Sequence, residues 1–157
     1  MPDSAEPAAE NAFELSVTRS IAAPPEKVWD MMTNQMAAWW CPKPWRTEII
    51  EQDWRAGGRS AMVMRGPGGE EHVVEMMFLE VSPGRRFATT DAVRVGLMPA
   101  EPFIIGIWEI AADGGGTRYT ARARHWSEEA MQRHRDMGFE DGWSTCANQL
   151  AELCEGK

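Results

Sequence analysis

The feature that most constrains the fold of this chain is the passage from an alternating segment to a helical one in its last third. Residues 117–125 alternate between apolar and polar side chains, as a strand with one buried face does. Ser127 follows as a helix-capping residue, with Glu128 and Glu129 behind it, and apolar residues then recur at helical spacing to about residue 153. We therefore expect a strand that leads directly into one long C-terminal helix.

Earlier segments of the chain have the pattern of short strands separated by turns. Glycine or proline bounds each alternating run, which is typical of hairpins in an antiparallel meander. The expected strands cover residues 13–21, 47–54, 59–65, 70–81, 86–92, 103–111 and 117–125, with a loop at 93–102. Short helices are expected at 26–32, after two prolines, and within the apolar segment 34–45. The predicted fold is α+β, a curved antiparallel sheet wrapped around the C-terminal helix, with two short helices after the first strand.

Composition limits the class of protein. The 157 residues, 43% of them hydrophobic, are enough for one domain with a sizeable core. No apolar run reaches the length of about 20 residues that a bilayer span needs. The net charge of −8, with Lys and Arg scattered, argues against a nucleic-acid partner. We expect residues 1–12 to be a mobile tail and residues 13–157 to form a single ligand-binding domain.

The number and spacing of the cysteines indicate whether the protein works in a reducing or an oxidising compartment. There are three, an odd number, and none of them has C-x-x-C spacing. This pattern fits a reducing environment better than a disulfide-stabilised secreted scaffold, so we expect a cytoplasmic protein.

Large, polarizable side chains are unusually frequent. Eight Trp and eleven Met accompany one Tyr and five Phe, and such side chains suit an irregular cavity as well as a tight core. A curved sheet and a helix cannot pack flat everywhere, so we expect a ligand cavity between them. Two glycines on the inner face of the helix either widen this cavity or allow the helix to pack closely against the sheet. The residues expected to line it are Trp39, Trp40, Trp54, Met62, Met64, Phe78, Phe103, Trp108, Gly138, Gly142, Trp143 and Cys146.

Several segments together resemble a known family. They are Ile21-Ala-Ala-Pro-Pro-Glu-Lys-Val-Trp29, the Trp39-Trp40 pair before Pro42, Gly57-Gly58-Arg59, Val81-Ser-Pro83, and His125-Trp-Ser-Glu-Glu129 continuing through His134 and Met137-Gly-Phe-Glu-Asp-Gly-Trp143. The chain is similar to the START-like, Bet v 1-like (SRPBCC) superfamily, and within it to the bacterial branch named after homologues of the activator of heat-shock-protein-ninety ATPase. The resemblance implies a helix-grip fold with a deep apolar pocket. It does not fix a function, because this superfamily includes lipid carriers, hormone receptors and aromatase/cyclases. The segment before Trp39 is shorter than in most relatives, so the shape of the pocket entrance is not carried over.

Metal and nucleophile chemistry have weak support in the sequence. His125 ends a strand and His134 lies two turns into the expected helix, so the two need not converge, and no third ligand stands at a fixed spacing. We expect no metal site and a hydrogen-bonding role for a histidine near the helix start. Cys146 would be made inert by burial in apolar surroundings, so no catalytic residue is expected.

Charged side chains on the strands leave alternatives open. Glu75, Asp91, Glu101 and Glu109 could point inward, and a buried carboxylate could serve as a general base. Most arginines on the strands are expected to face water or pair with Glu across the sheet, and one of them could instead orient a carboxylate-bearing ligand. The candidates for these roles are Arg46, Arg59, Arg65, Arg94 and Arg122.

The leading functional hypothesis is a cytoplasmic protein, monomeric or homodimeric, that binds a small apolar or aromatic molecule without a cofactor. Two alternatives remain. One is a module that interacts with a chaperone or another protein. The other is an enzyme of the cyclase, dehydratase or hydrolase type that acts in the same pocket.

Overall fold

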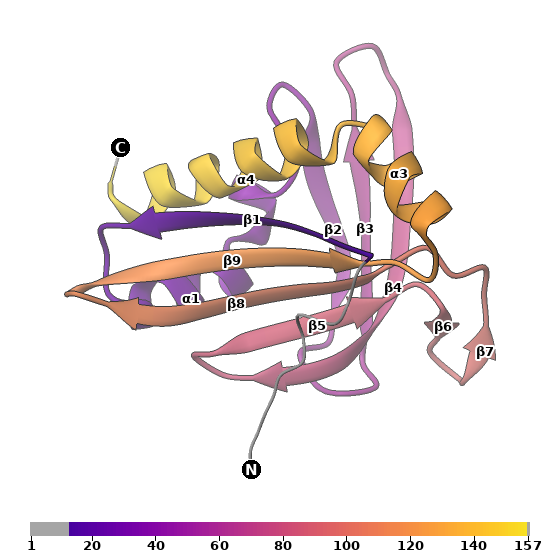
Figure 1. The fold of residues 1–157 in the computed structure, drawn as a ribbon, viewed down its shortest axis with the longest axis horizontal. Helices are drawn as coiled ribbons and strands as arrows, with labels where there is room; N and C mark the ends of the chain where they lie inside the picture. Colours follow the sequence, from indigo (N-terminus) through magenta and orange to yellow (C-terminus); the bar gives the residue numbers. More distant parts are fainter. Residues whose placement is uncertain (1–12, 157) are drawn as a thin grey trace.

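Seven strands form one antiparallel sheet in the computed structural model of the chain, which describes residues 13–156 (Figure 1). The expected tail, residues 1–12, lies outside the described residues. The strand order is β1-β9-β8-β5-β4-β3-β2. The strands are β1 (Glu14–Ile21), β2 (Arg46–Gln52), β3 (Arg59–Arg65), β4 (Glu71–Ser82), β5 (Arg86–Thr90), β8 (Ile105–Asp113) and β9 (Gly116–Arg124). A small ribbon of β6 (Val93–Arg94) and β7 (Met98–Pro99) occupies the stretch expected to be a loop.

The strands form where the sequence alternates, because alternate side chains of a strand lie on opposite faces. In β1, Leu15, Val17 and Ile21 are buried between more exposed residues. Glycines at positive φ close several of the turns, among them Gly114 and Gly115 between β8 and β9. The predicted strands are therefore confirmed, with ends that differ by one or two residues.

The sheet is strongly curved. The register shifts between Ile49 and Glu51 of β2, and between Phe78 and Glu80 of β4, so each strand carries a bulge. Bulges bend a strand and increase its twist. In Figure 1, β2, β3 and β4 accordingly run across the direction of β1, β8 and β9. This curvature gives the sheet a concave face, which the helices cover.

Within residues 13–156, four helices pack on the sheet: α1 (Pro25–Asn34), α2 (Met36–Trp39), α3 (Glu128–Asp136) and α4 (Phe139–Cys154). Pro25 opens α1, and Ser127 caps α3 by accepting a hydrogen bond from the Ala130 N–H at 3.1 Å, as predicted. The prediction of one continuous C-terminal helix is wrong. Gly138 has a φ of +97°, a left-handed conformation that glycine adopts without steric cost, and it separates α3 from α4.

The core lies between the concave face and the helices. Val28 and Met32 of α1, Trp39 of α2 and Leu150 of α4 are fully buried there, against Tyr119 of β9. No helix in the described part of the chain is both long enough and apolar enough to cross a membrane.

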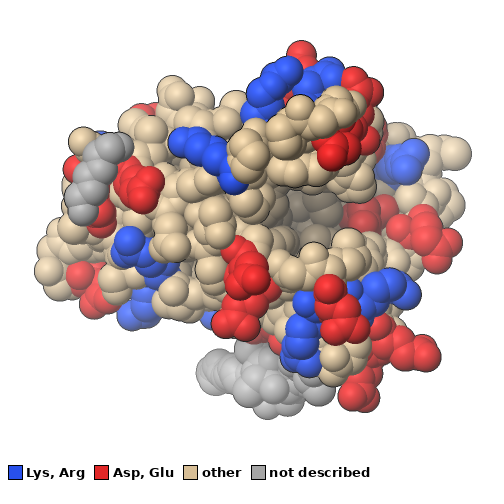
Figure 2. Space-filling view, turned by 90° about the horizontal axis from the view of Figure 1, so that it is seen from above, with Lys and Arg blue, Asp and Glu red and all other residues tan. Residues whose placement is uncertain are grey.

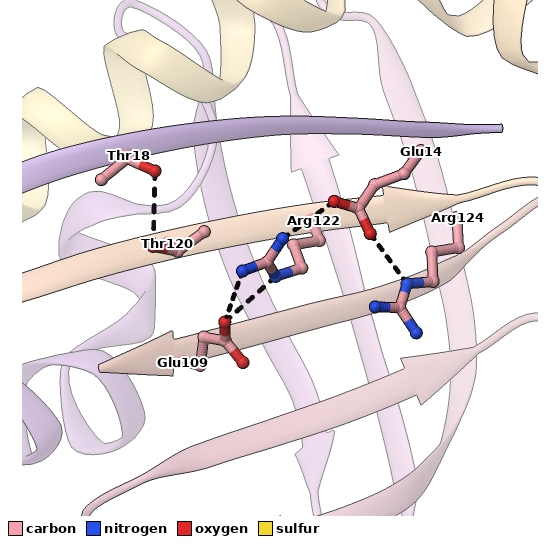
Figure 3. A network of polar contacts seen from close by, with 6 residues as sticks. All are labelled: Glu14, Thr18, Glu109, Thr120, Arg122 and Arg124. Atoms are coloured by element: carbon pink, nitrogen blue, oxygen red, sulfur yellow. Dashed lines mark hydrogen bonds and ion pairs between the residues drawn. The ribbon is translucent and has the colours of Figure 1, made fainter. Parts of the chain in front are cut away.

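The opposite face of the sheet carries an ion-pair network (Figure 3). Arg122 of β9 reaches Glu14 of β1 at 2.8 Å and Glu109 of β8 at 2.9 Å, and Arg124 reaches Glu14 at 2.9 Å. The expectation that Arg122 pairs across the sheet is confirmed. Glu109, one of the carboxylates that could have faced inward, belongs to this outer face.

Candidate functional site

A cavity of about 500 Å³ lies between the concave face of the sheet and the C-terminal helices. Its walls come from α2, α3 and α4 and from strands β3, β4, β5 and β8, and the face viewed in Figure 2 is hollowed. The lining residues are Met36, Trp40, Ser60, Met62, Met64, His72, Val73, Val74, Glu75, Met76, Phe87, Thr89, Asp91, Arg94, Glu101, Phe103, Ile104, Trp108, His134, Met137 and Trp143. The volume falls within the range of pockets that hold small molecules.

Half of the residues predicted for this site lie on the cavity wall. They are Trp40, Met62, Met64, Phe103, Trp108 and Trp143. Trp39 and Phe78 are instead buried in the core, and Trp54 packs against Phe78 and Phe87. Cys146 is also a core residue. Gly138 and Gly142 are not among the lining residues: Gly138 is the capping residue of α4, and Gly142 faces Pro42.

Tryptophans form the inner wall. Trp108 of β8 and Trp143 of α4 stack with their planes 17° apart and their centroids 5.5 Å apart. Trp40, directly after α2, meets both of them edge-on at 5.6 and 5.3 Å. Phe87 stacks on the other side of Trp108 at 5.1 Å. Each ring is thus held by its neighbours, so the wall is rigid, apolar and aromatic.

Two carboxylates on the cavity wall, Glu75 and Asp91, are committed to protein partners. Arg59 binds both carboxylate oxygens of Glu75 at 2.9 and 3.0 Å, and these hydrogen bonds hold the pKa of Glu75 below its usual value. Asp91 accepts hydrogen bonds from the backbone N–H groups of Phe103 and Ile104. The lowered pKa makes the Glu75 carboxylate a weak proton acceptor and hence a poor general base.

Two histidines meet at one end of the cavity, which the sequence analysis did not anticipate. His125 Nε2 lies 2.9 Å from His134 Nδ1, and His125 Nδ1 lies 2.8 Å from the carbonyl oxygen of Phe13. Burial, and secondarily the neighbouring His125, lower the pKa of His134 to about 4, so its ring is neutral at pH 7. The turn between β9 and α3 brings the two rings together, and the spacing of the two histidines in the sequence does not predict that turn.

The remaining chemical candidates from the sequence are the Cys146 thiol and possible metal ligands. Burial raises the pKa of Cys146 to about 12, so the thiol is protonated, as expected for an apolar site. Within residues 13–156, no group of three or more His, Cys, Asp or Glu side chains is arranged to hold a metal ion.

The fold and the cavity can be compared with known proteins. The family model described as activator of Hsp90 ATPase homolog 1-like protein matches residues 22–155. The chain belongs to this family. The expected resemblance to the START-like, helix-grip proteins is therefore confirmed. No curated protein gives a significant match.

Solved structures of bacterial proteins agree with this assignment. A protein from Nitrosomonas europaea is 34% identical, with a TM-score of 0.84 over 92% of this chain and 96% of its own. A protein from Mycobacterium smegmatis is 28% identical, with a TM-score of 0.76 over 90% of each chain. A protein from Arthrobacter aurescens shares the fold at 21% identity, with a TM-score of 0.81 over 98% of this chain and 92% of its own.

Proposed function

We propose that residues 13–157 act as one START-like domain that binds a small apolar or aromatic molecule in the cavity between the sheet and the C-terminal helices. The observation that carries this proposal is the wall of Trp40, Trp108 and Trp143, three packed aromatic side chains that line the cavity. Apolar surface on such a wall gains free energy when a ligand removes it from water. The proposed setting is the cytoplasm, with no cofactor.

Intrinsic fluorescence tests the proposal directly. Because three tryptophans line the cavity, a bound ligand should quench or shift the emission of the folded protein. The titration uses a panel of fatty acids, sterols and polycyclic aromatic molecules. Saturable changes with at least one class support the proposal. If no member of the panel changes the emission of a sample that circular dichroism shows to be folded, the proposal is wrong.

A matched pair of variants locates the binding site. Met64→Trp adds bulk to a half-buried position on the cavity wall, whereas Leu79→Trp adds the same side chain at an exposed position of β4 outside the cavity. We expect calorimetric titration to show at least tenfold weaker binding for Met64→Trp and unchanged binding for Leu79→Trp. Equal affinities in the two variants would place the ligand elsewhere.

The two alternative functions receive less support. An enzyme would need an acid or base of suitable pKa, and the carboxyl of Glu75 is shifted downward rather than upward. A chaperone-binding role rests on the description of the family alone. We therefore propose ligand binding as the function.

A further inference from the structure

The hydrogen bonds of the pair His125 and His134 run in one direction, from donor to acceptor. A carbonyl oxygen can only accept a hydrogen bond, so His125 Nδ1, which lies 2.8 Å from the Phe13 carbonyl, must carry a proton. Neither ring has a carboxylate among its hydrogen-bond partners, and burying an uncompensated charge is costly. A neutral imidazole carries one proton, so His125 with its proton on Nδ1 has a bare Nε2, which accepts a hydrogen bond from His134 Nδ1 at 2.9 Å.

The same reasoning fixes the far side of His134. A neutral imidazole carries one proton, and in His134 that proton lies on Nδ1. Its Nε2 is therefore a bare hydrogen-bond acceptor. The ring lines the cavity, and Nε2 forms no hydrogen bond with any described residue. The chain of contacts from the Phe13 carbonyl through His125 thus ends in an acceptor at the cavity wall.

The surroundings of this acceptor are aromatic. The His134 ring lies 4.8 Å from Phe103, 5.1 Å from Phe139 and 5.9 Å from Trp143, measured between ring centroids. Only 8% of His134 and 5% of His125 is exposed, so the pair is held rigidly by packing. A ligand atom that reaches Nε2 would leave water and enter a site of low dielectric, where an unpaired donor or acceptor is costly.

Several other polar groups on the wall already have protein partners. The Ser60 hydroxyl donates to Gln52, and the Thr89 hydroxyl contacts the sulfur of Met76. Asp91 accepts from two backbone N–H groups. His134 Nε2 differs from these groups because its one remaining hydrogen-bonding position has no partner among the described residues. The Trp108 indole N–H on the same wall is also buried without a partner there, but it is a donor and cannot accept a hydrogen bond from a hydroxyl group.

We propose that His134 Nε2 is a ligand-binding acceptor that selects, among apolar aromatic molecules, those that carry a phenolic hydroxyl. This inference rests on the proposed function of the cavity. A phenolic O–H is a strong donor that stays protonated at neutral pH, since its ordinary pKa is about 10. The ring of such a molecule packs against the tryptophan wall, and its hydroxyl group donates a hydrogen bond to His134 Nε2. His125 is a positioning residue, because it acts only by fixing the tautomer of His134.

Two probes of the same size test the inference. They are 2-naphthol and 2-methylnaphthalene, which differ by a hydroxyl in place of a methyl group. The measured quantity is the selectivity, the dissociation constant of 2-methylnaphthalene divided by that of 2-naphthol. We expect His134→Phe to lower the selectivity about tenfold relative to the unmodified protein, the effect of one buried hydrogen bond. Gln132→Phe, at an exposed position of the same helix, should leave it unchanged.

The outcomes separate this inference from the proposed function. If both probes bind and His134→Phe has the selectivity of the unmodified protein, the acceptor role is wrong while ligand binding stands. If neither probe binds the unmodified protein, the inferred role of His134 is wrong. The fluorescence panel then decides whether other classes of ligand bind.

A measurement on the unmodified protein avoids any effect of mutation on folding. Nitrogen-15 NMR of the histidine side chains should show that His134 Nε2 carries no directly bonded hydrogen at neutral pH. Its resonance should move when 2-naphthol is added and stay in place with 2-methylnaphthalene. A hydrogen bonded directly to Nε2 in the free protein, or equal shifts with the two probes, would overturn the inference.

Discussion

At the scale of single residues, the site depends on side chains whose properties are set by what packs around them. His134 is an example, because an imidazole in water is half-protonated near pH 6.5, whereas this one has a pKa of about 4. The rings that face it, Phe103, Phe139 and Trp143, carry no charge that could stabilise an imidazolium. Its other neighbour is His125, which can only oppose a second positive charge.

This shift links stability to pH. The unfolded chain takes up a proton at His134 below pH 6.5, while the folded protein resists protonation down to about pH 4. The unfolded state therefore binds more protons in this window, and the free energy of unfolding falls as the pH is lowered through it, by up to about 3 kcal/mol. Urea denaturation at pH 7 and pH 5 should show a smaller loss for His134→Phe than for the unmodified protein. Parallel pH profiles in the two proteins would contradict the shift, since other titrating groups are common to both.

Trp143 is the residue on which the cavity wall most depends. It is only half-buried, yet Trp40, Trp108 and Phe139 all contact its ring. We expect Trp143→Ala to lower the free energy of unfolding by about 2–3 kcal/mol, less than a fully buried Trp would cost, because one side of the ring already lacks contacts. Urea melts and ligand titration should show that affinity falls more than stability. A variant that is simply unfolded would assign Trp143 to the core instead.

At the scale of elements, the break between α3 and α4 has the largest consequence. Gly138 lies between α3 and α4, and Gly142 lies within α4, although the sequence around both glycines fits the pattern of a single helix. A methyl group at Gly142 would meet only Pro42 at 4.0 Å, an ordinary van der Waals contact. At Gly138 the space is open, but the φ of +97° strains any other residue.

The two glycines should therefore respond to alanine with opposite signs. Gly142→Ala should raise the free energy of unfolding by about 0.5–1 kcal/mol, because alanine has the higher helix propensity and lowers the conformational entropy of the unfolded chain. Gly138→Ala should lower it by about 1–2 kcal/mol through backbone strain. Thermal melts of both variants provide the measurement. Destabilisation by Gly142→Ala would mean that α4 packs more tightly against Pro42 than this structure has it.

At the scale of the whole molecule, the sheet and the helices enclose all three thiols. Cys41 follows α2, Cys146 lies in the middle of α4 and Cys154 at its end, and all are buried. Burial raises the pKa of Cys146 to about 12 and that of Cys154 to about 11, and it raises that of Cys41 as well. The thiols are thus both protonated and inaccessible in the folded protein.

Thiol labelling should consequently report global unfolding. A disulfide reagent at pH 8 is expected to leave all three cysteines unmodified in the native protein and to react with them together as denaturant unfolds it. Mass spectrometry of partly labelled samples distinguishes the sites. Early modification of Cys41 alone would show instead that the segment after α2 opens separately from the sheet.

The sequence by itself determined the elements of this protein. Alternation at β1 and β9, Pro25 at the start of α1 and the Ser127 cap of α3 are local signals, since each depends on residues within a few positions of one another. Such signals predicted the order of strands and helices and the helix-grip architecture. They also placed tryptophans such as Trp108 and Trp143 on elements that face one another.

Only the tertiary structure decided which side chains meet. Helical periodicity does not predict the left-handed conformation of Gly138, which separates α3 from α4, and it does not predict that Gly142 faces Pro42 rather than the cavity. Trp39 and Trp40 are neighbours in the sequence, but only Trp40 lines the cavity, whereas Trp39 is fully buried in the core. The contact between His125 and His134 likewise depends on the path of the chain between β9 and α3. Periodicity fixes which face of an element is apolar, whereas the relative placement of elements fixes what that face touches.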